Sequence, residues 1–168
     1  MAEAILSELV RRRGIPAEIA AVGLLPGGVP MPLETRDALR ALHYDGPQLA
    51  AHRSRELSDA DIGSADLILG LARDHVREVV VRMPSAWDRT FTLKELVRRA
   101  ESVGPRLPDQ ELSSWLAAVS LDRTRQDLLG SSNADDVADP IGGPPSGFEH
   151  TAAEIEGLCV ALCALVWP

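Results

Sequence analysis

Apolar residues recur along this chain at two spacings, and the two spacings predict different elements. Apolar residues three and four positions apart mark one face of a helix, whereas short continuous apolar runs between turn residues are typical of strands. By the first pattern we expect a short helical turn from residue 58 and helices over residues 1–13, 33–43, 73–83, 92–100, 109–121 and 151–166.

Three short segments fit the second pattern. Residues 18–22 are largely apolar, residues 66–71 form a continuous apolar run, and Thr90-Phe91-Thr92 is a brief β-rich stretch. A run such as 66–71 is expected for a strand buried on both faces of a parallel sheet. Because these strands alternate with helices, the expected fold class is α/β, with three layers and a short parallel sheet flanked by helices.

Local signals mark where several helices begin and end. Gly14 follows three arginines and is a natural C-terminal cap for the first helix. Ser58 with Asp61, Thr92 with Glu95, and Thr151 with Glu154 have the spacing of capping boxes, in which each side chain satisfies the other's backbone N–H. We therefore expect the last helix to open at Thr151.

Length and loop spacing indicate the domain organisation. A chain of 168 residues is enough for one domain with a sizeable core, so residues 1–168 are expected to form a single domain. Residues 130–147 are polar and rich in glycine and proline, which predicts a loop. This loop is longer than an ordinary connection, so it is expected to be either functional or mobile, and it contains the Asp139-Pro140 turn.

Composition narrows the classes of partner. The net charge of −8 provides no basic footprint for nucleic acid, and no apolar run approaches the length of a membrane span. No secretory leader is recognisable, and two cysteines are too few for a disulfide framework, so a cytoplasmic location is expected. The four histidines lack paired metal-ligand spacing, so no metal or other cofactor is expected. Nothing in the sequence indicates an oligomeric state.

Several segments, read in order, carry a resemblance to a known family. The chain opens with Met-Ala-Glu-Ala-Ile-Leu, continues with His-Arg-Ser-Arg-Glu-Leu from His52 and Thr-Phe-Thr-Leu-Lys-Glu-Leu from Thr90, and later contains Asp-Pro-Ile-Gly-Gly from Asp139. In this order and spacing the segments resemble the low-molecular-weight protein tyrosine phosphatase family. The resemblance covers nearly the whole chain and implies a hydrolase that acts on a phosphorylated protein or a small phosphate monoester, without a cofactor or metal.

The resemblance also implies residue roles. In this family a thiolate in a Cys-(x)5-Arg loop attacks phosphorus, and an aspartic acid of an Asp-Pro loop protonates the leaving oxygen. It assigns that acid to Asp139, followed here by Ile141 where many phosphotyrosine-directed members carry an aromatic residue. Phosphotyrosine preference is therefore not implied. Cys159 and Cys163 lack an arginine at the required distance and are expected to be buried, inert helix residues.

Residues 1–168 contain no Cys-(x)5-Arg sequence. The family's loop lies directly before the Met-Ala-Glu-Ala helix, so we expect the first strand and the nucleophile loop to be missing, Met1 to be a misassigned start, and residues 1–168 to be inactive. Two alternatives remain open at this point. One is a pseudophosphatase that acts as a binding or regulatory module. The other is a related arsenate reductase, whose thiol relay would need cysteines in a mobile segment.

Overall fold

A computed structural model describes residues 1–128 and 132–168, apart from the side chains of Pro47, Gln48 and Asp127. The chain divides into two compact units. Unit 1 comprises Met1–Leu57 and Ala138–Val160, and unit 2 comprises Ser58–Val137 and Ala161–Pro168. The elements in chain order are α1 (Ala2–Arg12), α2 (Leu33–Ala41), α3 (Pro47–Ala51), α4 (Asp59–Ser64), β1 (Ile68–Gly70), α5 (Arg73–Arg82), η1 (Pro84–Arg89), β2 (Thr90–Thr92), α6 (Leu93–Val103), α7 (Leu112–Val119), η2 (Arg125–Leu128) and α8 (Pro145–Val166).

Unit 1 begins with α1, whose C-terminal end confirms the predicted glycine cap. Gly14 has φ +65°, and its N–H donates to the carbonyl of Arg11 at 3.1 Å. The next N–H, that of Ile15, reaches back to the carbonyl of Val10 at 2.9 Å. This pair of bonds is the Schellman motif, which satisfies the last carbonyls of a helix and requires a residue that tolerates positive φ.

The predicted strand over residues 18–22 is wrong. The segment forms no strand, although burial alternates from residue 15 to residue 20 as in an extended chain with one covered face. The N–H of Ala21 donates to the carboxylate of Glu3 at 3.3 Å, and pairing begins at Gly23, which bridges Glu56 in parallel. Apolar composition favours an extended chain, but a strand also needs a neighbouring ladder, which the described residues do not provide here.

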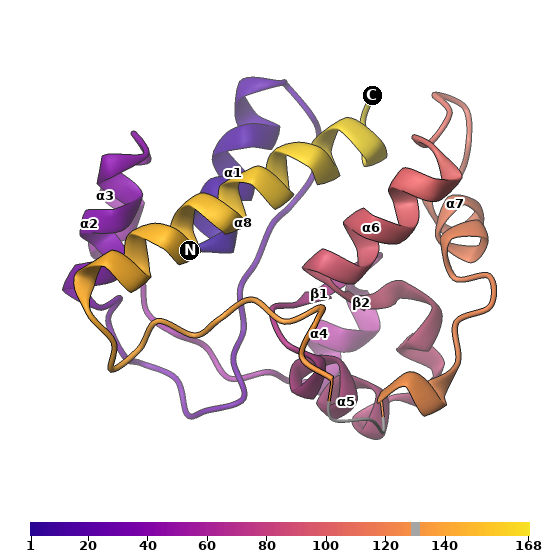
Figure 1. Cartoon of the computed structure of the whole chain (residues 1–168), viewed down its shortest axis with the longest axis horizontal. Helices are drawn as coiled ribbons and strands as arrows, with labels where there is room; N and C mark the ends of the chain where they lie inside the picture. Colours follow the sequence, from indigo (N-terminus) through magenta and orange to yellow (C-terminus); the bar gives the residue numbers. More distant parts are fainter. Residues whose placement is uncertain (129–131) are drawn as a thin grey trace. The chain divides into compact units, whose positions relative to one another are not determined.

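Unit 2 contains the sheet. β1 and β2 pair in parallel, with Ile68 opposite Thr90 and Gly70 opposite Thr92. The crossover between them runs through α5, which packs against both strands, and α6 packs against β2 (Figure 1). The fold is therefore α/β, with a short parallel two-stranded sheet flanked by helices, as the alternating pattern predicts.

The strand predicted over residues 66–71 exists but is shorter and less buried than expected. β1 has three residues, and its Ile68 and Leu69 are only half-buried, whereas all three residues of β2 are buried. A continuous apolar run resembles a strand covered on both faces, but the covering depends on neighbouring elements that sequence periodicity does not reveal.

Two predicted capping boxes are tested in unit 2. Ser58 and Asp61 form the complete box at the start of α4. At α6, the hydroxyl of Thr92 accepts from the N–H of Glu95 at 3.1 Å, so the first half of the box is present. The Glu95 carboxylate bonds instead to Arg99 and Arg123, because two guanidinium groups are stronger partners for it than one amide.

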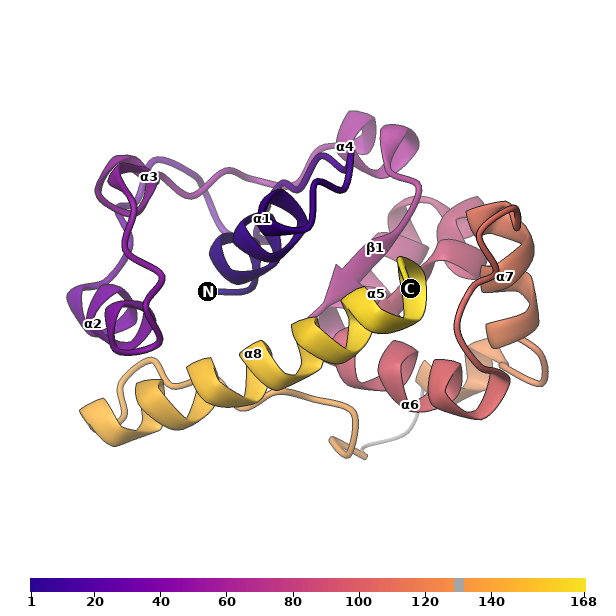
Figure 2. The same cartoon turned by 90° about the horizontal axis from the view of Figure 1, so that it is seen from above.

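The third predicted box is wrong, because α8 begins at Pro145 rather than at Thr151. Proline suits the first position of a helix, where its missing N–H would be unpaired in any case. Phe148 and Ala152 are buried together with Ala38 of α2, which anchors these first turns. Figure 2 shows the start of α8 close to α2. The predicted loop of 130–147 therefore ends before Pro145, and residues 130 and 131 lie outside the described residues.

Among the described helices, none combines the length and the apolar character that crossing a membrane would require.

Candidate active site

The predicted acid, Asp139, lies in unit 1 on an exposed turn. Its Oδ1 accepts a hydrogen bond from the N–H of Ile141 at 3.0 Å, the arrangement of an Asx turn. Pro140 biases Asp139 towards an extended backbone. The Asx turn and Pro140 together restrict how the carboxyl group is presented, and the carboxyl stays open to an incoming molecule.

The glycines that follow close this turn. The N–H of Gly143 donates to the carbonyl of Pro140 at 2.9 Å, and Gly142 between them has φ +82°. Positive φ at the third position is what a type II turn requires. A Cβ at Gly143 would lie 3.1 Å from the Pro140 oxygen, so this position is tight as well. Both glycines therefore shape a compact turn behind Asp139.

The two cysteines lie buried in α8 and form no disulfide. Cys159 is 1% exposed and Cys163 is fully buried, as expected for packed helix residues. An attacking thiolate needs access to its substrate and a setting that favours the charged form. Burial denies Cys159 and Cys163 that access, so the structure does not bring them together with Asp139 as a catalytic pair.

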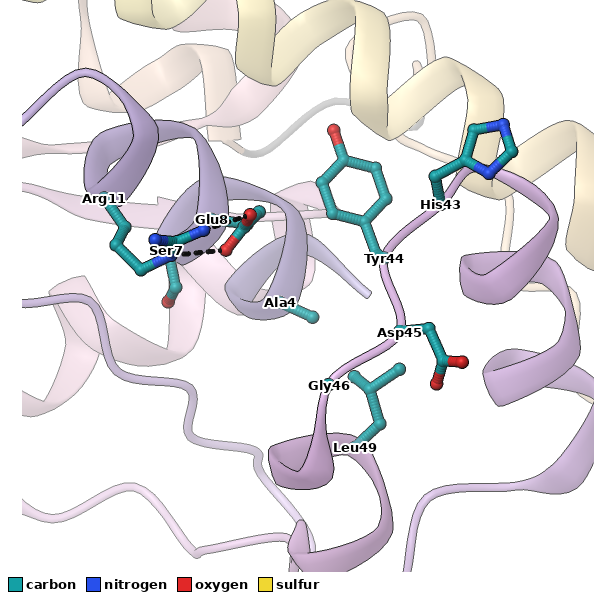
Figure 3. Close-up of a pocket in the computed structure, with 9 residues that line it drawn as sticks. All are labelled: Ala4, Ser7, Glu8, Arg11, His43, Tyr44, Asp45, Gly46 and Leu49. Carbon is teal, nitrogen blue, oxygen red and sulfur yellow. Dashed lines mark hydrogen bonds and ion pairs between the residues drawn. The ribbon is translucent and has the colours of Figure 1, made fainter.

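A cavity of about 510 Å³ in unit 1 is a second place where polar groups gather. Figure 3 shows it between α1 and residues 43–49, with Arg11 bonded to Glu8 and the Tyr44 ring forming one wall. Asp139 is not among its lining residues. The Glu8 carboxylate also accepts from Arg12 at 2.7 Å, and these arginines lower the pKa of Glu8 to about 2. The charges of Glu8 and Arg11 in this cavity therefore already pair with each other.

A cavity of about 480 Å³ in unit 2 contains a buried arginine that the sequence analysis missed. The Arg123 guanidinium lies 3.7 Å from the centre of the Trp87 ring and 4.1 Å from that of Phe91. It donates to both carboxylate oxygens of Glu95, at 2.7 and 3.1 Å, and to the carbonyls of Trp87 and Thr90. Burial lowers the pKa of Arg123, and the bond to Glu95 opposes that shift.

The Arg123 cluster has a structural role. The Nε, Nη1 and Nη2 atoms of the Arg123 guanidinium all donate to groups of unit 2, and the Trp87 and Phe91 rings lie against the guanidinium. No local sequence pattern predicts the pairing of Arg123 with Glu95, because the two residues are 28 positions apart. Trp87 is 8% exposed and packs in the core of unit 2.

Metal chemistry has no candidate within the described residues, where no three His, Cys, Asp or Glu side chains lie close enough together to hold an ion. The described residues thus define an α/β protein, in which unit 2 has a parallel strand pair with a helical crossover and unit 1 has an exposed carboxyl group on a compact Asp-Pro turn.

The comparisons with known proteins give this class a family. The chain belongs to the low-molecular-weight phosphotyrosine protein phosphatase family, whose sequence model matches residues 1–111. It is 29% identical over 109 residues to a protein-arginine-phosphatase of Geobacillus stearothermophilus, a match that covers 65% of this chain and 51% of that protein. It is 24% identical over 158 residues to a protein-arginine-phosphatase of Bacillus subtilis (strain 168), covering 94% of this chain and 81% of that protein.

A solved structure is similar in fold. The low-molecular-weight protein tyrosine phosphatase of T. tengcongensis matches with a TM-score of 0.69 and 26% identity, covering 96% of this chain and 86% of that one. The family match ends at residue 111, before Asp139, and the chain spans about half the length of the Geobacillus relative. The family match therefore does not include Asp139.

Proposed function

We propose that this chain is the scaffold and proton-donating part of a phosphatase that acts on a phosphorylated protein or a small phosphate monoester, with Asp139 as the general acid. The observation that carries the proposal is the exposed, hydrogen-bonded Asp139 turn in a chain of the phosphatase family. A cytoplasmic location belongs to the same proposal and is supported by two cysteines that form no disulfide.

The chemistry requires one proton at one moment. As a thiolate forms its bond to phosphorus, the bond from phosphorus to the leaving atom breaks, and that atom needs a proton to depart as a neutral group. The Asp139 carboxylic acid supplies the proton and becomes a carboxylate. In the second half of the reaction the carboxylate takes a proton from water as the water oxygen attacks phosphorus and releases the thiolate. Residues 1–168 have no Cys-(x)5-Arg sequence to provide the thiolate.

The substrate class follows from the relatives and from Ile141. Two relatives are named protein-arginine-phosphatases, and the residue after the Asp-Pro pair is an exposed aliphatic side chain, 71% accessible, rather than an aromatic one. A phosphorylated arginine side chain offers no aromatic ring to stack against. We therefore propose protein phosphoarginine ahead of phosphotyrosine, with the proton from Asp139 going to the leaving guanidinium nitrogen.

The test compares residues 1–168 with a version in which a strand and a Cys-(x)5-Arg-Ser-Pro loop precede Met1. We expect turnover of phenyl phosphate and of a phosphoarginine-bearing protein only from the extended version. In that version Asp139→Asn should lower kcat about 10²- to 10⁴-fold, the usual range for loss of a general acid. Glu149→Gln is the matched control, because Glu149 is an exposed carboxylate near the same turn, at the start of α8. Full turnover in Asp139→Asn would refute the assignment of the acid.

A further inference from the structure

Thr151 of α8 makes a contact that its position in a helix does not predict. A threonine inside a helix commonly bonds its hydroxyl to the carbonyl four residues earlier. Here the Thr151 hydroxyl donates at 3.2 Å to the carbonyl of Ala138, which is 13 residues earlier and outside the helix. Ala138 is the residue directly before Asp139.

The first turns of α8, which carry Thr151, are held within unit 1. Its neighbours Phe148 and Ala152 are 4% and 0% exposed and pack with Ala38 of α2, and the Thr151 side chain is itself 4% exposed. A buried hydroxyl that lost its partner would keep the cost of its desolvation, so the bond to Ala138 is strongly favoured over no bond.

The contact restrains the peptide group that leads into Asp139. The Ala138 carbonyl and the Asp139 N–H belong to one planar peptide unit, so fixing the oxygen fixes the plane from which Asp139 departs. On the other side, the Asp139 carboxylate is held by the N–H of Ile141, and Gly143 closes the turn onto Pro140. The acid is thus restrained from both sides, and Thr151 provides the link to a rigid element.

We propose that Thr151 is a positioning residue for Asp139: its hydroxyl fixes the peptide before the acid, so that the carboxyl is presented to the leaving group in one orientation. This inference rests on the proposed role of Asp139. A misplaced acid transfers its proton less efficiently, since proton transfer needs hydrogen-bond distance to the leaving atom. Substrate binding does not depend on the Thr151 hydroxyl.

The first measurement uses residues 1–168 and amide hydrogen exchange. Thr151→Val keeps the shape of the side chain and removes the hydroxyl, and Thr151→Ser restores a hydroxyl. We expect exchange at the amides of Ile141 and Gly143 to be about tenfold faster in Thr151→Val and near wild type in Thr151→Ser. Amides in α6 serve as the control for overall stability. Thr151→Ala replaces the valine variant if that variant does not fold. Unchanged exchange at both amides would overturn the proposal.

The second measurement separates positioning from general damage. In the extended, turnover-competent version, kcat is compared for phenyl phosphate, a poor leaving group that needs the proton, and p-nitrophenyl phosphate, a good leaving group that needs it less. We expect Thr151→Val to lower kcat for phenyl phosphate about tenfold, with a smaller change for p-nitrophenyl phosphate and an unchanged KM, and Thr151→Ser to restore it. Structural damage alone would lower both equally.

The Asp139→Asn variant distinguishes the proposed acid role of Asp139 from the proposed positioning role of Thr151. If it changes the leaving-group ratio and Thr151→Val does not, Thr151 has no positioning role, the inference fails and the proposed acid stands. If Asp139→Asn itself leaves the ratio unchanged, the proposed acid fails and the inference fails with it. A change of ratio in both variants, with rescue by serine, supports both.

Discussion

Tyr44 shows how one buried side chain sets a measurable property. It is the single tyrosine of the chain, its side chain is 6% exposed, and its hydroxyl donates to the Glu156 carboxylate at 2.8 Å. Burial and the neighbouring carboxylate disfavour the tyrosinate and raise the pKa of Tyr44 to about 12.

The first prediction concerns this titration. Ultraviolet absorbance of tyrosinate should show a midpoint near 12 in the folded protein and near the ordinary value of about 10 in denaturant. The folded state holds the proton more tightly, so this contribution to stability is complete below pH ~10 and is lost as the pH rises towards 12. Glu156→Gln should lower the folded midpoint. A midpoint near 10 in the native protein would contradict the buried hydroxyl.

The second prediction concerns Arg123. Removing one partner of a buried ion pair leaves the other charge uncompensated, at a cost of about 3–5 kcal/mol. Arg99 still pairs with Glu95 at 3.1 Å, so Arg123→Ala should lower the free energy of unfolding by the lower end of this range, about 3 kcal/mol, in a denaturant titration. Arg125→Ala is the control, since the Arg125 side chain is exposed and donates to the Pro84 carbonyl at 2.9 Å. Equal effects of the two changes would argue against the buried cluster.

At the scale of an element, local chemistry decides where helices end more reliably than where they begin. The end of α1 follows directly from Gly14, because the Schellman motif needs positive φ at that position. The start of α8 could not be predicted in the same way. Thr151 with Glu154 has the spacing of a capping box, but Pro145 already opens the helix and Phe148 anchors it in the core of unit 1.

A matched pair of glycines provides the third prediction. Gly14→Ala places a Cβ at φ +65° and should destabilise the protein by about 1–2 kcal/mol. Gly157 lies inside α8, and nothing lies within 4 Å of the Cβ that alanine would add. Gly157→Ala should therefore stabilise by about 0.5–1 kcal/mol, since alanine is the better helix former. Thermal unfolding of the two variants should show shifts of opposite sign.

At the scale of the whole molecule, the extended segment over residues 18–22 is the feature most sensitive to its surroundings. Burial alternates over residues 15–20, as in a strand, but the described part of the chain offers residues 18–22 no ladder. Backbone pairing starts beyond this segment. The N–H of Gly23 donates to the carbonyl of Arg55, and the N–H of Leu57 donates to the carbonyl of Gly23, both at 2.8 Å.

The fourth prediction follows from this contrast. Amides of residues 18–22 in the 168-residue protein should exchange at least about 100-fold faster than those of β2, because exposed amides without backbone partners open at almost no cost. The amides of Gly23 and Leu57 are the internal controls, and we expect them to be protected. Protection of residues 18–22 equal to that of β2 would mean that a ladder partner covers them.

That residues 1–168 form one domain stays a prediction.

Sequence alone determined the class of fold, the helix faces and the Asp-Pro turn, because periodicity, capping and turn chemistry act within a few residues of one another. It also pointed to Asp139 as the acid, through the order of the family's segments. Tertiary structure decided which apolar run became a strand, where α8 began, that Glu95 turned to Arg123, and that Thr151 reached Ala138. Each of these depends on a partner supplied by another element, and a partner that is distant in sequence leaves no local pattern to read.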